Sequence, residues 1–174
     1  LLGGRRMPRD TRLYAVDPGS GALQRAVPLP PEPDILRWDC GGRLLVGHGT
    51  PSGSGPPGQL SRVEPGRFEV TSVALAGACS SIVPAGEQRA FVLTRALRGG
   101  EDGPFASHAV AEVDLGRGRV LRRQAVAQGA RQLEVGPSGL LYVSHASGPG
   151  TMATDGSISV IRPRTLELVR RLRL

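Results

Sequence analysis

The sequence predicts an all-β protein made of repeated four-stranded antiparallel sheets, and three observations lead to this fold class. Glycine and proline supply 25 and 15 of the 174 residues, which argues against long helices. Aromatic residues make up only 3% of the chain and hydrophobic residues 39%, so Leu, Val and Ala must form the core. Two kinds of β-hairpin also alternate along the chain, with a period of about 48 residues.

The first kind of hairpin has a turn that contains proline or glycine. The residues before this turn are Asp17, Glu64, Asp114 and Arg162, at spacings of 47, 50 and 48. Proline presets φ at the second turn position and glycine permits positive φ, so each copy is expected to be a strand, a turn and a strand. The second kind is a glycine turn followed by a very apolar strand, in residues 38–46, 83–92 and 135–143.

Together the two hairpins give four strands per repeat, which is typical of the blades of a β-propeller. We expect complete blades over residues 33–76, 78–127 and 130–174. Residues 1–30 are expected to be the end of an earlier blade, whose second strand ends in Leu1-Leu2. The chain would then hold about three and a half blades of one β-propeller region, 1–174. A helix through residues 122–135 is the competing interpretation, and Gly129 argues against it.

The expected environment of the strands follows from this order. The second strands, which contain Leu44-Leu45-Val46 and Leu140-Leu141-Tyr142-Val143, are continuously apolar and are expected to be buried on both faces. The outermost strands carry arginines that we interpret as a solvated edge, which discourages pairing with other chains. These arginines are Arg122, Arg123, Arg170, Arg171 and Arg173.

Charge and composition exclude several function classes. The net charge is +7 and every basic residue is Arg, a bias that a GC-rich coding sequence produces. Because aromatic stacking partners are also few, we do not expect nucleic acid as a partner. The absence of Lys excludes a P-loop and a pyridoxal Schiff base. No apolar run is long enough for a membrane span, and no motif indicates a cofactor or a metal.

The last repeat carries a resemblance to a known family. Residues 129–145, which contain Pro137-Ser138-Gly139 and Leu141-Tyr142-Val143-Ser144-His145, and residues 156–163 resemble the YVTN-type, YncE-like β-propeller repeat. His48, Thr94 and His145 stand where that family has Asn. The resemblance implies a seven-bladed ring, of which this chain would be about half, and an extracytoplasmic (periplasmic or secreted) location. The rest of the ring, or a second copy, would then be a partner.

A candidate site lies in the connections between second and third strands, because repeat proteins place their longer insertions on the binding face. These connections are expected over residues 47–58, 95–107 and 146–156. Polar and titratable residues gather in them, with His48 and His145 closing the second strands and His108 opening a third strand. The full candidate set for ligand binding is His48, Arg95, Arg98, Asp102, His108, His145 and Asp155.

Several roles are open for these residues. His48 and His145 suit a structural role in which a repeated polar side chain hydrogen-bonds the turn. A metal site and a general base are the alternatives. We expect a noncatalytic binding or scaffolding propeller for a small ligand or a protein partner. A lactonase-like or lyase-like enzyme with its site in the same loops is the alternative.

The two cysteines are expected to remain unpaired. Alignment of the glycine turns places Cys79 beside Arg131, near the start of a first strand, and Cys40 beside Pro137 at its far end. An extended strand separates such positions by roughly 20 Å, which is beyond disulfide reach.

Overall fold

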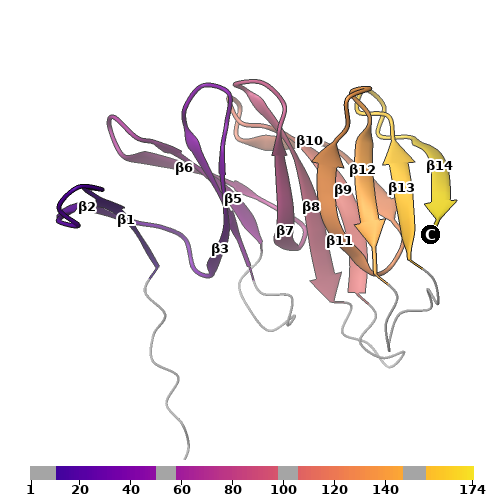
Figure 1. The fold of residues 1–174 in the computed structure, drawn as a ribbon, viewed down its shortest axis with the longest axis horizontal. Coiled ribbons are helices and arrows are strands. Elements are labelled where there is room, and N and C mark those ends of the chain that lie inside the picture. The colour runs from indigo at the N-terminus through magenta and orange to yellow at the C-terminus, as the bar shows by residue number, and fades with distance from the viewer. Residues whose placement is uncertain (1–10, 50–57, 98–105, 147–155) are drawn as a thin grey trace, which may run out of the picture.

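The computed structural model describes residues 11–49, 58–97, 106–146 and 156–174, and these residues form β-strands joined by turns. Figure 1 shows the sheets standing side by side. The strands are β1 (Arg12–Val16), β2 (Leu23–Pro28), β3 (Pro33–Trp38), β4 (Leu44–His48), β5 (Gln59–Glu64), β6 (Glu69–Ala74), β7 (Ala78–Pro84), β8 (Arg89–Leu97), β9 (Ala106–Asp114), β10 (Arg119–Val126), β11 (Ala130–Val135), β12 (Leu141–His145), β13 (Ser157–Ile161) and β14 (Leu168–Arg173).

The strands form three four-stranded antiparallel sheets and one two-stranded sheet. The four-stranded sheets follow the chain as β3-β4-β5-β6, β7-β8-β9-β10 and β11-β12-β13-β14, and β1 pairs with β2. We call the three complete sheets the first, second and third blades, and the pair β1–β2 the half blade. The predicted fold class of four-stranded antiparallel blades is confirmed, and residues 122–135 hold the end of β10, a turn and β11 rather than a helix.

Tight turns close both kinds of hairpin, as the sequence predicts. Gly42, Gly86 and Gly139 have φ of 73°, 79° and 75° at the turns between first and second strands. Glycine adopts this left-handed region without the Cβ penalty that other residues incur. The turns between third and fourth strands need positive φ as well, and two of them place Phe68 and Leu166 there, with φ of 58° and 59°.

The hydrophobic core lies between the blades rather than within any one of them. Leu45 and Leu60 of the first blade pack with Ile82 and Val92 of the second. The other face of the second blade contributes Phe91 and further residues to a cluster with the third blade. The innermost strands of neighbouring blades contact one another, β3 with β7 and β7 with β11, so the blades fan outward from that side.

Burial corrects one expectation for the second strands. β4 is buried along its whole length, as predicted, but β12 alternates between buried and half-buried residues. Val143 faces the second blade and is fully buried, whereas Tyr142 and Leu140 are half-buried. The third blade is covered on one face only by the residues that the structure describes, so its second strand is not buried on both faces.

The interpretation of the outer arginines as a solvated edge is wrong for Arg122. Its Nε donates a hydrogen bond of 2.8 Å to Oε2 of Glu112, a carboxylate that is buried in β9. Arg122 also donates to the backbone carbonyl of Arg164 in the third blade. A register shift between Val120 and Arg122 precedes this contact. By contrast, Arg123, Arg170, Arg171 and Arg173 are exposed, as predicted.

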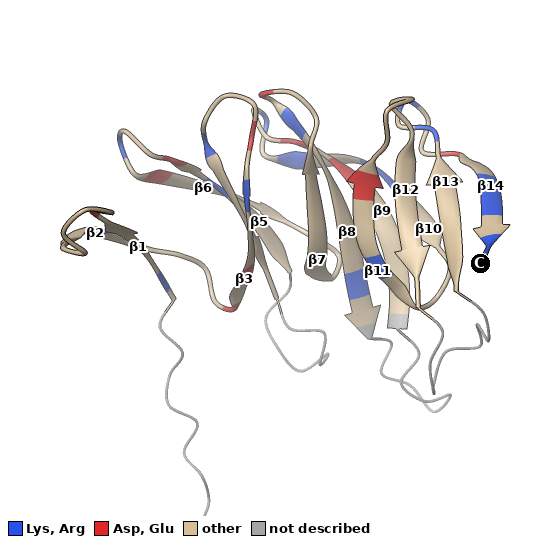
Figure 2. Ribbon diagram, in the orientation of Figure 1, with Lys and Arg blue, Asp and Glu red and all other residues tan. Residues whose placement is uncertain are grey.

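Charged residues gather at the turns and the outer strands. Figure 2 shows β7, β12 and β13 without charged residues, while the turns and β14 carry them. The described ranges contain no helix of the length and apolarity that a bilayer crossing needs. The predicted strand ending in Leu1-Leu2 lies outside the described residues.

Candidate functional site

The predicted loop-end residues are only partly described. His48, Arg95, His108 and His145 have defined positions, whereas Arg98, Asp102 and Asp155 lie outside the described residues. Figure 1 shows β8 and β12 ending at the side opposite the tight turns, so the four described residues share one side of the blades.

A repeated β-bulge defines the position of the histidines. His48, Thr94 and His145 pair with Pro33, Cys79 and Ala130 in the first strand of their own blade. In each blade the register then shifts by one residue, leaving out Asp34, Ser80 and Arg131. This bulge places Cys79 level with Ala130 rather than with Arg131, which corrects the predicted alignment by one residue. Bulges bend a strand locally and recur where a side chain is aimed in a particular direction.

His145 has the structural role that the repeat predicts. Its Nδ1 lies 3.2 Å from the backbone carbonyl of Gln128, in the connection just before β11. Its Nε2 lies 2.9 Å from Oγ of Ser159 on β13. Burial lowers the pKa of His145, although the Gln128 carbonyl opposes the shift. Because burial lowers this pKa below 6.5, the imidazole is neutral at pH 7, and its two contacts connect β12 with the segment before β11 and with β13.

His48 differs from this expectation. It is 1% exposed, yet neither ring nitrogen forms a hydrogen bond with the described residues. Burial lowers its pKa, and the nearby carbonyls of Pro31 and Pro30 partly oppose the shift without reaching hydrogen-bond geometry. The prediction that both histidines hydrogen-bond a turn is therefore wrong for His48.

The second blade corrects the predicted loop boundaries. β8 continues to Leu97 and β9 begins at Ala106, so Arg95 and His108 lie within strands and pair directly with each other. Arg95 is half-buried, and its Nε is buried with no hydrogen-bond partner among the described residues. His48, His145 and the Arg95–His108 pair belong to three different blades. In the part of the chain that the structure describes, no three His, Cys, Asp or Glu side chains are grouped as metal ligands.

A polar cleft between the first and second blades is a candidate site that sequence reasoning missed. It has a volume of about 650 Å³ and lies beside the tight turns, away from the loop ends. The first blade contributes side chains of β5, β6 and their turn, and the second blade contributes two of its turns. The residues that line it are Arg62, Glu64, Gly66, Arg67, Glu69, Thr71, Gln88, Leu115 and Gly116.

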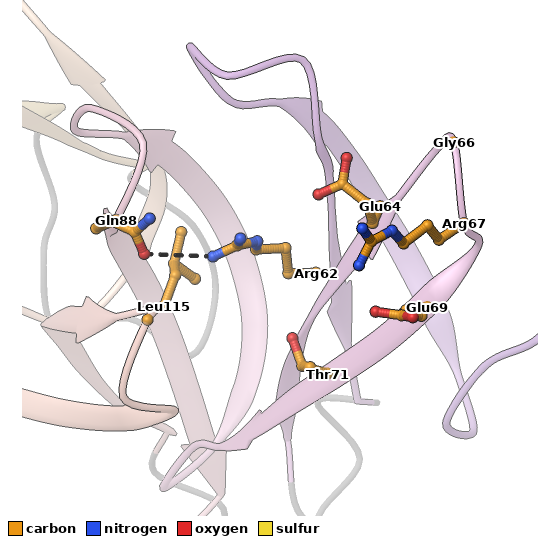
Figure 3. Close-up of a pocket in the computed structure, with 9 residues that line it drawn as sticks. Arg62, Glu64, Gly66, Arg67, Glu69, Thr71, Gln88 and Leu115 are labelled. Atoms are coloured by element: carbon orange, nitrogen blue, oxygen red, sulfur yellow. Dashed lines mark hydrogen bonds between the residues drawn. The ribbon is translucent and has the colours of Figure 1, made fainter.

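Figure 3 shows how the charged groups of this polar cleft are arranged. Arg62 extends from β5 toward the second blade, where its Nη1 donates to Oε1 of Gln88 at 3.5 Å. Glu64 and Glu69 face each other across the ladder of β5 and β6. The guanidinium of Arg67 reaches back from the turn toward these two carboxylates in this view. The polar cleft therefore presents two cationic and two anionic groups side by side.

Contacts between the turns hold the walls of the polar cleft in place. The amide of Leu115 donates to the carbonyl of Gln88 at 2.8 Å, so the two turns of the second blade are tied together. Arg43 binds Asp39 of its own turn at 3.0 Å and Glu87 of the second blade at 3.2 Å. The two blades are thus joined by an ion pair close to the polar cleft.

Comparisons with known proteins show the fold of the chain but no specific family. No protein-family model matches the chain, and no curated protein matches its sequence. The chain is similar to hydrazine synthase of Kuenenia stuttgartiensis (TM-score 0.71, 19% identity) over 94% of this chain and 43% of that one. It is similar to acylaminoacyl peptidase of Pyrococcus horikoshii (TM-score 0.63, 10% identity) over 94% of this chain and 27% of that one. It is also similar to the dihydro-heme d1 dehydrogenase NirN (TM-score 0.55, 17% identity), over 92% of this chain and 33% of that one.

These similarities are to β-propeller proteins, so the chain has the fold of part of a β-propeller. It spans less than half the length of each of the three proteins. At such low identity the shared fold carries no activity with it, because unrelated functions occur on the same propeller frame.

Proposed function

We propose that this chain is a noncatalytic β-propeller binding or scaffolding module. The observation that carries the proposal is the polar cleft, whose walls come from strands and tight turns of two joined blades. Groups held on strands keep their positions better than groups on long loops, and such preorganisation lowers the entropic cost of binding.

The charges of the polar cleft define the class of ligand. Arg62 and Arg67 suit a carboxylate, because a guanidinium can donate two parallel hydrogen bonds to it. Glu64 and Glu69 face each other and suit a cationic group of the ligand, which would add to the compensation that the nearby guanidinium of Arg67 gives them. We therefore propose a small zwitterionic molecule, or a peptide segment of a protein partner, that carries both a carboxylate and a cation.

We also propose that the blades are of the YVTN type and that the loop-end side forms a second binding surface. Support for the first point comes from residues 129–145, which form the first two strands of the third blade in the order that the family motif has. Support for the second comes from Arg95, whose buried Nε has no partner among the described residues. Arg98, Asp102 and Asp155 remain candidates for that surface.

Nuclear magnetic resonance on the isotope-labelled chain tests the polar cleft, with the dipeptide arginyl-glutamate as the probe. We expect saturable shifts of the backbone amides of Arg67, Thr71 and Gln88 on titration. Arg62→Gln and Glu69→Gln should each weaken binding by roughly tenfold, which corresponds to about 1.4 kcal/mol for one charged hydrogen bond.

Arg173→Gln is the matched control, because Arg173 is an exposed arginine on β14 of the third blade. It should leave the affinity unchanged. Shifts confined to residues near His48 and His145 would move the binding site to the loop-end side. Hydrolysis of a simple lactone by the chain would contradict the noncatalytic part of the proposal.

A further inference from the structure

The second and third blades turn polar side chains toward each other at their loop ends. Successive side chains of a strand point to opposite faces of its sheet. Phe91 and Leu93 of β8 pack with the third blade, so Arg95 on the same strand points toward that blade as well. Val143 of β12 packs with the second blade, and His145 therefore faces it in return.

The strand pairing extends each of these two positions into a row across its blade. Leu93, Val110 and Val143, one level closer to the tight turns, belong to the apolar cluster that joins the two blades. The rows therefore form the loop-facing end of this interface. We call them the loop-end rows, and their members are Arg95, His108 and Val126 of the second blade and His145, Ser157 and Arg173 of the third.

Arg95 carries a charge that the described residues do not neutralise. The residue is half-buried, and its Nε is buried without a hydrogen-bond partner among the described residues. A buried charge without a partner is costly, so this guanidinium indicates a ligand. The described acids of the two blades all lie toward the tight turns, at Glu87, Glu112, Asp114, Glu134 and Glu167.

The third blade adds positive charge to the loop-end rows. Arg171 and Arg173 lie on the face of β14 that is turned toward the second blade, and Nε of Arg171 donates to Oγ of Ser157 at 3.1 Å. Burial lowers the pKa of His145, and the charge of Arg171 contributes to this shift. Because the described residues at this level include arginines and no carboxylate, the loop-end rows attract anions.

We infer that the loop-end rows bind a small carboxylate ligand, with Arg95 as its anchor. The inference rests on the proposed loop-end surface and not on the polar cleft. Nε and one Nη of a guanidinium form a planar pair of donors that matches the two oxygens of a carboxylate. A carboxylate bound in this way gives the buried Nε of Arg95 its missing partner, while Arg171 and Arg173 attract the ligand from across the interface.

A phosphate fits these residues less well than a carboxylate. Its three acceptor oxygens require more donors than one guanidinium edge supplies. Arg171 already donates its Nε to Ser157, and both ring nitrogens of His145 have contacts within the third blade. Arg95 therefore offers one guanidinium edge, which matches one carboxylate.

Nuclear magnetic resonance of the Arg95 side chain tests the inference on the unaltered chain. The probe is succinate, and the control is succinamide, which has nearly the same size but no charge. Succinate should move the Nε–H proton signal of Arg95 downfield in a saturable way, at millimolar concentrations, and succinamide should not. The backbone amides of Arg67 and Thr71 report separately on the polar cleft, so failure of one site is distinguishable from failure of the other.

Two variants separate a specific contact from general attraction by charge. Arg95→Lys keeps the charge but lacks the paired donors, and it should bind succinate roughly tenfold more weakly or worse. Arg123→Gln is the matched control, because Arg123 is exposed and pairs with Ala111 on the face of β10 turned away from the third blade. It removes a full charge and should leave the affinity unchanged. Circular dichroism checks that both variants remain folded.

Four results would overturn the inference. The first is an Nε–H signal of Arg95 that does not move at high millimolar succinate, or that succinamide moves as far. The second is full affinity in Arg95→Lys, which would leave only general attraction by charge. The third is tighter binding of inorganic phosphate than of succinate. The fourth is an Nε–H signal that is already far downfield without the probe, which would place a carboxylate of the chain itself on Arg95.

Discussion

The hydroxyl of Ser81 on β7 binds both backbone polar groups of Leu133 on β11. Its Oγ donates to the carbonyl of Leu133 at 3.3 Å and accepts from the amide of Leu133 at 3.2 Å. Both residues are buried, at 4% and 0% exposure. The second and third blades are therefore joined in a fixed register by one side chain, in addition to their apolar contact.

Ser81→Ala should lower the free energy of unfolding by about 1–3 kcal/mol. The substitution leaves a buried amide and a buried carbonyl without partners, and the loss of their solvation is not recovered. Urea unfolding followed by circular dichroism measures the change. Ser138→Ala, at an exposed turn, is the control and should stay within about 0.5 kcal/mol of the parent chain.

Glu112→Gln should also destabilise the chain, by about 1–3 kcal/mol. The Glu112 carboxylate is 2% exposed and binds Arg89 at 2.9 Å and Arg122 at 2.8 Å. Both arginines are partly exposed, so water can solvate them when the charge of Glu112 is removed. The loss in free energy of unfolding therefore stays below that for a fully buried ion pair. Equal stability of Glu112→Gln and the parent chain in urea unfolding would show that this network contributes nothing.

Gly47→Ala should cost about 1–3 kcal/mol through overpacking between the first and second blades. A Cβ at Gly47 would lie 2.5 Å from Sγ of Cys79 and 2.9 Å from its Cβ. Gly66→Ala is the control, because nothing lies within 4 Å of its Cβ position. Adding Cys79→Ala should recover part of the loss, and a thermal melt of the double variant no higher than that of Gly47→Ala would contradict the contact.

Stability should fall as the pH drops below about 6.5. Burial lowers the pKa of His48 and His145 in the folded chain below the ordinary value of 6.5. As the pH falls, the unfolded chain therefore binds protons before the folded chain does. Each histidine then lowers the free energy of unfolding by up to about 1.4 kcal/mol per pH unit. Above pH 6.5 this contribution is complete and stability should not change further from this source.

Two variants separate the histidines in the same urea experiments at pH 8 and pH 5.5. His145→Gln should be less stable already at pH 8, because it alters the bonds to Gln128 and Ser159. His48→Leu should lose no stability at pH 8, since the ring nitrogens of His48 form no hydrogen bonds with the described residues. Each variant should show a shallower pH dependence, and an unchanged slope in both would contradict the assignment.

The cysteines should differ strongly in reactivity. Both are free, which confirms that they do not form a disulfide with each other. Cys40 is exposed, whereas burial raises the pKa of Cys79 to about 12. Because the thiolate is the reactive form, a thiol reagent at pH 8 should modify one cysteine quickly and the other only after unfolding. Two fast thiols in the native chain would show that the interface around Cys79 opens readily.

The hairpins could be predicted from sequence because their turns are specified locally. Glycine and proline at Pro18, Gly42, Pro65 and Gly139 limit φ within a few residues, and the apolar pattern then selects the buried strands. The bulge beside His48 and His145 could not be predicted in this way. The residues left out of register, Asp34, Ser80 and Arg131, share neither size nor charge.

The polar cleft and the Glu112 network depend on packing between distant segments. Arg62 and Gln88 meet only because the first blade packs on the second, and neither residue belongs to a motif. Arg122 reaches Glu112 only after the register shift in β10, so its place on an outer strand suggested a solvated edge instead. Side chains at the loop ends were found because they recur in the repeat, and recurrence marks structural positions such as His145 as readily as ligand-binding ones.

The strand order of the blades has a consequence for how the chain folds. Each sheet is formed by one continuous stretch of chain, and among the described residues no strand of one blade pairs with a strand of another. Every sheet can therefore grow by successive closure of neighbouring hairpins, a local search that is fast compared with pairing distant strands. Cooperativity must then come from the interfaces between sheets, so a substitution at Ser81 or Gly47 should uncouple neighbouring units and broaden the unfolding transition.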